Sequence, residues 1–257
     1  MKTIKLGSNN IDTLFLQASL GLKSLDGSFG AKTKEAVIEY QKSIGVTADG
    51  IVGPGTWSKI ISSRTTITDK DYDELASRLG INSACLKAVK KVESGKAPFL
   101  PSGYPTLLFE AHIFYKYLLS IGKKDPKNFI KAHSNILSRV WNKALYKGGE
   151  KEVLRLDEAW NISPTTALYS ASFGAFQICG FNWKSCGCSS VNEFVGKMWL
   201  GEKQQLEIMG EFLKNAGLIK YLKALNWTGF AKAYNGPEYA KNSYDSRLKI
   251  AYNSYSK

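Results

Sequence analysis

Long apolar runs are missing from this 257-residue sequence. No stretch approaches the roughly 18 consecutive apolar residues that a membrane-spanning helix requires. Met1 and Lys2 are followed by no apolar segment of the kind found at the centre of a secretory signal peptide. We therefore expect a protein that is made, and stays soluble, in a cytoplasm.

Cysteine and histidine are both scarce. The four cysteines are Cys85, Cys179, Cys186 and Cys188. They are too few and too unevenly placed for a disulfide framework. Cys186 and Cys188 are one residue apart, which is not the spacing of a zinc knuckle, and only His112 and His133 could join them. We expect reduced, partly buried thiols, no metal site and no cofactor.

Acidic residues are outnumbered. The chain has 35 Lys and Arg against 22 Asp and Glu, a formal net charge of +13. Such a surface attracts nucleic acids, anionic membranes or bacterial envelope polymers. The basic residues occur singly and in pairs, and no helix-turn-helix, zinc or aromatic sheet motif accompanies them. We therefore expect an anionic envelope surface as a partner. We expect no specific nucleic acid, because the charge is the only feature that would suggest one.

An internal repeat marks the first part of the chain. The segments DGSFGAKT at 26–33 and DGIVGPGT at 49–56 share the pattern D-G-x-[F/V]-G-x-x-T. Each Asp-Gly pair predicts a tight turn, and the next glycine relaxes the backbone before a helix. Apolar residues at helical spacing follow both turns and precede the first one. These signals predict a three-helix unit over residues 1–62.

This unit resembles the first type of bacterial peptidoglycan-binding domain. That family's pattern of Leu-Gln, DG-x-FG, T-x-x-AV-x-x-[FY]Q and DG-x-VG-x-x-T is matched from Leu16 to Thr56. The resemblance implies binding of peptidoglycan in a groove between helices, which the sequence does not locate. Most matching positions are expected only to build the fold. The polar segment 63–70 predicts a linker to a second domain.

Residues 71–257 show many helical stripes and few strand signals. Their number suits one domain. Proline and glycine interrupt the helical period between Phe99 and Leu108, where a short hairpin is expected. The predicted fold is therefore mainly α: a small three-helix domain followed by a larger α-helical domain.

Glu93 lies where helical spacing predicts an apolar residue. Leu86 and Val89 precede it by seven and four positions, and all three share one helix face. Gly95 and Pro98 predict the end of that helix. Burial and the negative end of the helix dipole would both raise the pKa of this carboxyl, as a general acid requires. The alternative is an ordinary solvated glutamate.

Two later segments carry groups that suit a sugar polymer. SASFGAFQICGFNW at 170–183 places small residues around Ser172 and Gln177, so that a ligand can approach the backbone. AKAYNGPEY at 231–239 adds the aromatic hydroxyl of Tyr234 and the amide of Asn235. Taken singly, each segment is equally well explained by tight helix packing or by a helix end.

In this order the three segments resemble the lysozyme-like superfamily, and more closely the N-acetylmuramidase domain of modular endolysins from phages that infect Gram-negative bacteria. The resemblance covers nearly all of 71–257. It implies that Glu93 protonates the glycosidic oxygen of the β-1,4 bond from N-acetylmuramic acid to N-acetylglucosamine, and that water then attacks. It also implies a monomer that stays in the host cytoplasm until holin-type release to the cell wall and host lysis.

Further roles follow from the same resemblance. Ser172, Gln177, Tyr234 and Asn235 would position substrate or water. The carboxylates considered for a second catalytic acid are Glu110, Asp157 and Glu158. For Glu110, which has apolar neighbours in the sequence, we expect a structural bond to backbone or to an arginine rather than catalysis.

Two alternatives stay open. A lytic transglycosylase on the same fold would use the muramyl C6 hydroxyl in place of water and would leave a 1,6-anhydro end. A non-catalytic wall-binding phage protein would bind peptidoglycan without cleaving it, which the helix-end position of Glu93 argues against.

Overall fold

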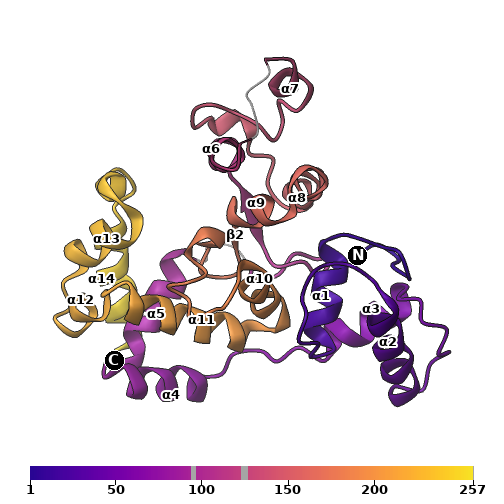
Figure 1. Cartoon of the computed structure of the whole chain (residues 1–257). Helices are drawn as coiled ribbons and strands as arrows, with labels where there is room; N and C mark the ends of the chain where they lie inside the picture. The colour runs from indigo at the N-terminus through magenta and orange to yellow at the C-terminus, as the bar shows by residue number, and fades with distance from the viewer. Residues whose placement is uncertain (94–96, 123–126, 257) are drawn as a thin grey trace.

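A computed structural model describes residues 1–93, 97–122 and 127–256 of the chain. Its N-terminal part, drawn in indigo and purple in Figure 1, is a three-helix unit. The helices are α1 (Ile11–Ser19), α2 (Ala31–Ser43) and α3 (Pro54–Ser62). Pro54 stands at the first helical position of α3, where its missing N–H and fixed φ cost nothing. Three helices at these places confirm the prediction from the repeat.

The repeat has a shared structural device. Gln17 donates through Nε2 to Asp26 Oδ1 (2.7 Å) and accepts from Gly27 N (2.9 Å). In the second copy, Gln41 donates to Asp49 Oδ1 (3.0 Å) and accepts from Gly50 N (2.9 Å). Both glutamines are buried, so each Asp-Gly turn is fixed to the preceding helix by a satisfied amide.

The larger part continues the helical pattern, so the mainly α prediction is confirmed. Its longer helices are α4 (Asp69–Leu79), α5 (Ser83–Glu93), α6 (Ala111–Ser120), α8 (Glu150–Ile162), α10 (Val191–Leu200), α11 (Glu202–Asn215), α13 (Trp227–Asn235) and α14 (Tyr244–Tyr255). Shorter helical pieces are α7 (Lys127–Ala132), α9 (Pro164–Tyr169), α12 (Ile219–Lys223) and the 3₁₀ turns η1 (Lys143–Leu145), η2 (Gly180–Asn182) and η3 (Pro237–Asn242).

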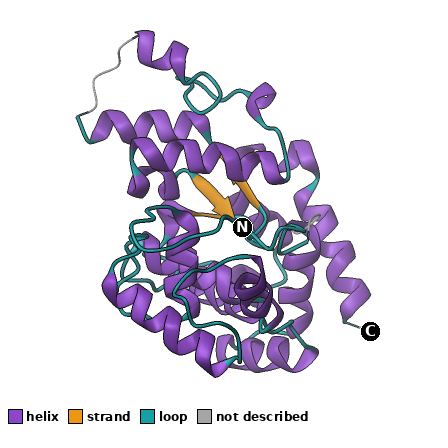
Figure 2. Cartoon of the chain, turned by 90° about the vertical axis from the view of Figure 1, so that its right-hand side faces the viewer, coloured by secondary structure: helices purple, strands orange, loops and turns teal. Residues whose placement is uncertain are grey.

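A small antiparallel sheet lies among these helices, as Figure 2 shows in orange. Its order is β1 (Leu107–Phe109), β2 (Ala171–Phe173) and β3 (Ile178–Cys179). The hairpin expected between Phe99 and Leu108 is only partly present. Phe99 pairs with Pro105 in an isolated bridge, whereas β1 pairs with the distant β2. The sequence does not predict β2 and β3, because strands of three and two residues are too short to show alternation.

Gly180 fixes the end of this sheet. A Cβ at this position would lie 1.9 Å from the carbonyl oxygen of Leu168, at the end of α9. No side chain fits there, so the residue after β3 must be glycine for the sheet to lie against α9.

The two domains share one hydrophobic core. Trp199 of α10 is fully buried, stacks on Phe15 of α1 (centroids 4.5 Å apart) and meets Trp57 of α3 edge-on at 5.8 Å. Tyr104 of the larger domain donates its hydroxyl to the buried Asp12 Oδ1 at 2.6 Å. Burial raises the pKa of this Asp12 carboxyl. An aromatic stack and a buried hydrogen bond hold the domains together.

The predicted linker packs against the larger domain. The Arg64 guanidinium sits over the rings of Trp199 (3.5 Å) and Phe99 (4.4 Å) and donates to the Gly103 carbonyl (2.7 Å). Burial lowers the pKa of Arg64 to about 9. The boundaries predicted at residues 62 and 71 stay a prediction; α3 ends at Ser62 and α4 begins at Asp69.

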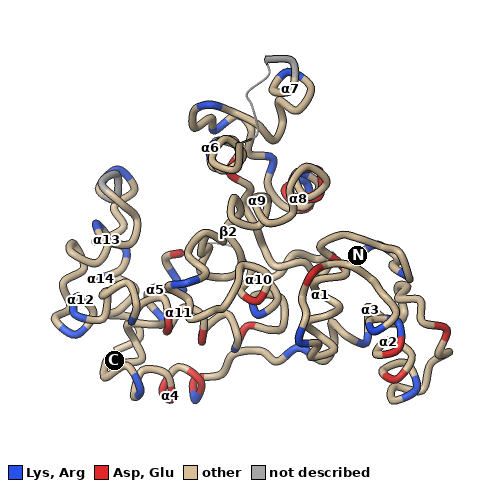
Figure 3. Tube along the Cα trace, in the orientation of Figure 1, with Lys and Arg blue, Asp and Glu red and all other residues tan. Residues whose placement is uncertain are grey.

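Basic side chains are spread over the described surface of both domains rather than gathered on one helix (Figure 3). None of the helices within the described ranges combines the length and apolar character that crossing a bilayer requires.

Candidate functional site

Glu93 is the last described residue of α5, and Gly95, which predicts the helix end, lies outside the described residues. Leu86 and Val89 on the same face are buried, and the Glu93 carboxylate accepts a hydrogen bond from Asn235 Nδ2 at 3.0 Å. Burial raises the pKa of Glu93; the Asn235 hydrogen bond and the charge of Arg247 lower it, and burial is the larger influence. The group is therefore held closer to its protonated state than a solvated glutamate, which is what proton donation requires.

Arg247 on α14 is a member of this cluster that the sequence analysis missed. Its Nη2 donates to the carbonyl of Val92 at 3.1 Å, in the last turn of α5, where a cation complements the helix dipole. Its guanidinium also lies 5.4 Å from the ring centre of Tyr244, whose pKa burial raises and the charge of Glu93 raises further. No local sequence pattern could have revealed this side of the site, because it depends on the packing of α14 against α5.

Tyr234 precedes Asn235 on α13 and is held by its surroundings. Its hydroxyl donates to the carbonyl of Phe176 at 3.0 Å, and its ring stacks on Phe230 with centroids 5.4 Å apart. Burial raises the pKa of Tyr234 well above its ordinary value, and the charge of Glu93 raises it further. The bond to Phe176 ties α13 to the sheet, so Tyr234 positions Asn235; its predicted contact with substrate stays a prediction.

Ser172 and Gln177 meet across the β2–β3 turn. Ser172 Oγ donates to Gln177 Oε1 at 3.1 Å, and Gln177 Nε2 donates to the carbonyls of Gly174 (2.9 Å) and Thr106 (3.2 Å). Gln177 has a φ of 48°, which a residue with a side chain adopts rarely. Its amide groups are therefore used within the turn, and a direct role of Ser172 or Gln177 on substrate stays a prediction.

Glu110 lies at the opposite end of the sheet, directly after β1. Its carboxylate accepts from the Tyr146 hydroxyl at 2.7 Å and lies 3.3 Å from His112 Nδ1. Tyr146 in turn accepts from Trp141 Nε1 at 2.7 Å. The carboxylate thus anchors an aromatic pair at the surface, and the expected bond to backbone or to an arginine stays a prediction.

The two other carboxylates proposed for catalysis have partners elsewhere. Asp157 pairs with Lys2 Nζ of the N-terminal domain at 2.6 Å. Glu158 accepts from His133 Nδ1 (3.1 Å) and Asn135 Nδ2 (2.5 Å). Asp157 thus takes part in the domain interface, and neither residue is among the groups that bond to or shift the pKa of Glu93.

The cysteines are free thiols. Burial raises the pKa of Cys179 to about 12 and that of Cys85 to about 11, so both are protonated at neutral pH. Within the described part of the chain, no three His, Cys, Asp or Glu side chains group in a way that could hold a metal ion.

The assembled site is a carboxyl of raised pKa on α5 that accepts from an amide of α13, with an arginine of α14 bonded to the preceding Val92 carbonyl. The N-acetylmuramidase family model matches residues 82–256, which include every one of these groups. The chain belongs to the N-acetylmuramidase family. A putative peptidoglycan-binding domain model matches residues 16–60 of the N-terminal unit. This muramidase therefore joins a wall-binding domain to a glycosidase domain, the combination of a peptidoglycan-hydrolysing endolysin.

The muramidase is similar to solved and curated proteins. The crystal structure of Burkholderia AP3 phage endolysin is 36% identical, with a TM-score of 0.67, over 99% of each chain. A zinc D-Ala-D-Ala carboxypeptidase of Streptomyces albus G is 51% identical over 37 residues, and an uncharacterized protein of Kitasatospora aureofaciens is 53% identical over 36 residues. These two matches span 14% of this chain, and 14% and 30% of those relatives.

Proposed function

We propose that this muramidase hydrolyses the β-1,4 bond between N-acetylmuramic acid and N-acetylglucosamine, with Glu93 as the general acid. The observation that carries the proposal is the Glu93 carboxyl itself, half-buried at the last described residue of α5 and with a raised pKa. It would protonate the glycosidic oxygen, and an oxocarbenium-like transition state would follow.

Asn235 would serve both the acid and the attacking water. Its Nδ2 holds Glu93, and its buried Oδ1 has no partner among the described residues. A buried carbonyl oxygen without a donor is costly, so a water or a sugar hydroxyl is expected to fill that position. Tyr234, which precedes Asn235 on α13, would hold Asn235 in position. Ser172 and Gln177 would shape the β2–β3 turn.

A second catalytic carboxylate is not needed in this scheme. Glu110 holds Tyr146 and His112, and its proposed role is to support the aromatic surface at the far end of the sheet. Asp157 and Glu158 are proposed to be structural. The transition state would then be stabilised by the buried site and by bound water, without a covalent intermediate on a second carboxylate.

The proposed biological setting is host lysis by a phage. The partners would be peptidoglycan and the anionic bacterial envelope, and the protein would act as a monomer. It would remain in the host cytoplasm until a holin-type pore released it to the wall.

The decisive experiment is product analysis on purified peptidoglycan. Mass spectrometry should find reducing N-acetylmuramic acid ends after digestion by the wild type, and none after digestion by Glu93→Gln. Anhydro-muramic ends would instead establish the lytic transglycosylase, in which the C6 hydroxyl replaces water. If the wild type binds the wall but forms neither product, the protein is a non-catalytic wall-binding protein.

A further inference from the structure

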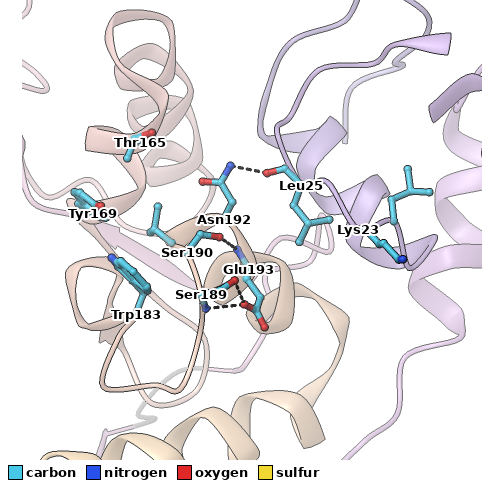
Figure 4. A pocket seen from close by; sticks show the side chains of 11 residues that line it. Lys23, Leu25, Thr165, Tyr169, Trp183, Ser189, Ser190, Asn192 and Glu193 are labelled. Atoms are coloured by element: carbon cyan, nitrogen blue, oxygen red, sulfur yellow. Dashed lines mark hydrogen bonds between the residues drawn. The ribbon is translucent and has the colours of Figure 1, made fainter. Parts of the chain in front are cut away.

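A hollow of about 590 Å³ lies between the two domains, and none of its lining residues belongs to the Glu93 cluster. Figure 4 shows the wall-binding domain on one side, with Leu25 and Lys23, and α9 with η2 on the other, with Tyr169 and Trp183. The first turn of α10 lies between them. We call this hollow the interdomain groove.

The catalytic-domain wall of the groove presents aromatic and amide groups. Tyr169 and Trp183 are partly exposed. Asn192 donates Nδ2 to the carbonyl of Leu25 at 2.5 Å, and its oxygen points toward the aromatic wall in Figure 4. An aromatic face beside an amide oxygen is suited to a sugar, which offers C–H faces and hydroxyl donors.

The charges of the groove favour an anionic ligand. Lys23 is exposed at the rim, on the wall-binding domain. The nearby Glu193 is already neutralised, because it pairs with Lys197 at 2.7 Å and accepts from Ser189 N (2.7 Å) and Oγ (2.6 Å). Among the described residues that line the groove, Lys23 is therefore the charge that is not offset by such a pair, so the field that a ligand meets there is positive.

The wall-binding domain carries a hollow of its own beside the groove. This second hollow, of about 580 Å³, is lined entirely by that domain, including Asp26 of the first repeat turn and Lys32 of α2. Leu22 and Lys23 line both hollows, so the two adjoin at these residues.

The relative position of the walls is fixed by the shared core. A Cβ at Gly196 of α10 would lie 3.0 Å from Leu25 Cδ1 and 3.1 Å from Ala18 Cβ, which shows how closely α10 approaches the wall-binding domain. The groove is thus preformed, and a ligand would not have to order two loosely joined domains.

We propose that the interdomain groove binds a peptidoglycan strand, with sugar rings on Trp183 and Tyr169 and an anionic lactyl or stem-peptide carboxylate near Lys23. The inference rests on peptidoglycan being the substrate, as proposed above. It gives both domains a part in holding one polymer, so that the wall-binding function does not belong to the N-terminal domain alone.

The test measures binding of full-length protein to purified sacculi by co-sedimentation, in a Glu93→Gln background that is not expected to cut them. Trp183→Ala and Lys23→Glu should each weaken binding about tenfold, the loss typical of a well-placed contact. Lys5→Glu makes the same charge change at another exposed position of the same domain, and Tyr255→Ala removes an exposed aromatic ring at the end of α14; both should bind like the parent.

Trp183→Ala can lower binding simply by destabilising the fold. Lys23→Glu changes an exposed side chain and therefore provides an independent measurement. The melting temperatures of all variants are compared with that of the parent. Binding within twofold of the parent by both groove variants would overturn the proposal, and so would an equal loss in Lys5→Glu. Failure of the proposed function can be told apart from failure of the groove proposal. If the proposed function is wrong, the wild-type protein releases no muropeptides, whatever the binding results.

Discussion

The proton affinity of Glu93 is set by opposing influences from named neighbours. Burial raises its pKa, and the Asn235 amide and the Arg247 guanidinium lower it. A carboxyl whose folded pKa is raised donates protons at low pH and loses this ability as pH rises through that pKa. The same shift affects stability. As pH rises from the ordinary pKa of a glutamate to the raised pKa of Glu93, the free energy of unfolding falls, and the loss is complete above the raised pKa.

Replacing Glu93 by Gln should therefore separate activity from stability. Cleavage of peptidoglycan should fall by about 10²–10⁴, the usual contribution of a general acid. The variant should be at least as stable as the wild type at neutral pH, because a buried carboxylate is removed. Initial rates and thermal unfolding of both proteins check this. A folded variant with more than roughly a tenth of the wild-type rate would rule out Glu93 as the acid.

The neighbours should move the pH profile in a defined direction. Asn235→Ala and Arg247→Gln each remove an influence that lowers the pKa of Glu93. The acid would stay protonated to higher pH, so the alkaline limb of kcat/KM should shift upward in both variants, although the maximal rate also falls for Asn235→Ala. The measurement is a pH–rate profile on a short soluble oligomer; a downward shift would contradict the assignment of these contacts.

Among the elements, the end of the β2–β3 hairpin depends on Gly180. Gly180→Ala would force a Cβ to within 1.9 Å of the Leu168 carbonyl, a backbone atom that cannot rotate away. We expect a loss of at least ~2 kcal/mol in the free energy of unfolding, as for other backbone clashes. Gly55→Ala in α3, where a Cβ would meet nothing within 4 Å, is the control and should be neutral or slightly stabilising. Denaturant titration compares the two.

The elements also show what sequence could predict. Apolar residues at helical spacing around Val37 and Val89 predicted helices, because this spacing is kept over the full length of each helix. Glu93 and Asn235 were found from short motifs, although 142 positions separate them. Arg247 was missed because its role depends on α14 packing against α5, a tertiary contact that no local pattern encodes. The sheet was missed because Leu107 pairs with Phe173, a register that sequence does not reveal.

At the scale of the whole molecule, the shared core argues against two independent modules. A piece from Thr68 onward would expose Trp199, which is fully buried in the complete chain. We expect this piece to retain some cleavage of short oligomers but to melt at a lower temperature than the full chain, because burying a large aromatic side chain contributes roughly 2–3 kcal/mol. Calorimetry of both forms checks this; equal melting temperatures would mean that the interface adds no stability.

The net charge of +13 leads to a prediction about the whole surface. Basic side chains on both domains should concentrate the enzyme at an anionic envelope, and salt screens this attraction over about 8 Å at physiological ionic strength. Lysis of permeabilised cells should therefore slow as salt rises. The chemical step at the half-buried Glu93 should respond much less, so rates on a short soluble oligomer should stay nearly constant over the same range. Parallel salt titrations of the two substrates measure the difference. An identical salt dependence for both would mean that the basic surface does not direct the enzyme to the wall, and that the excess of lysine serves solubility instead.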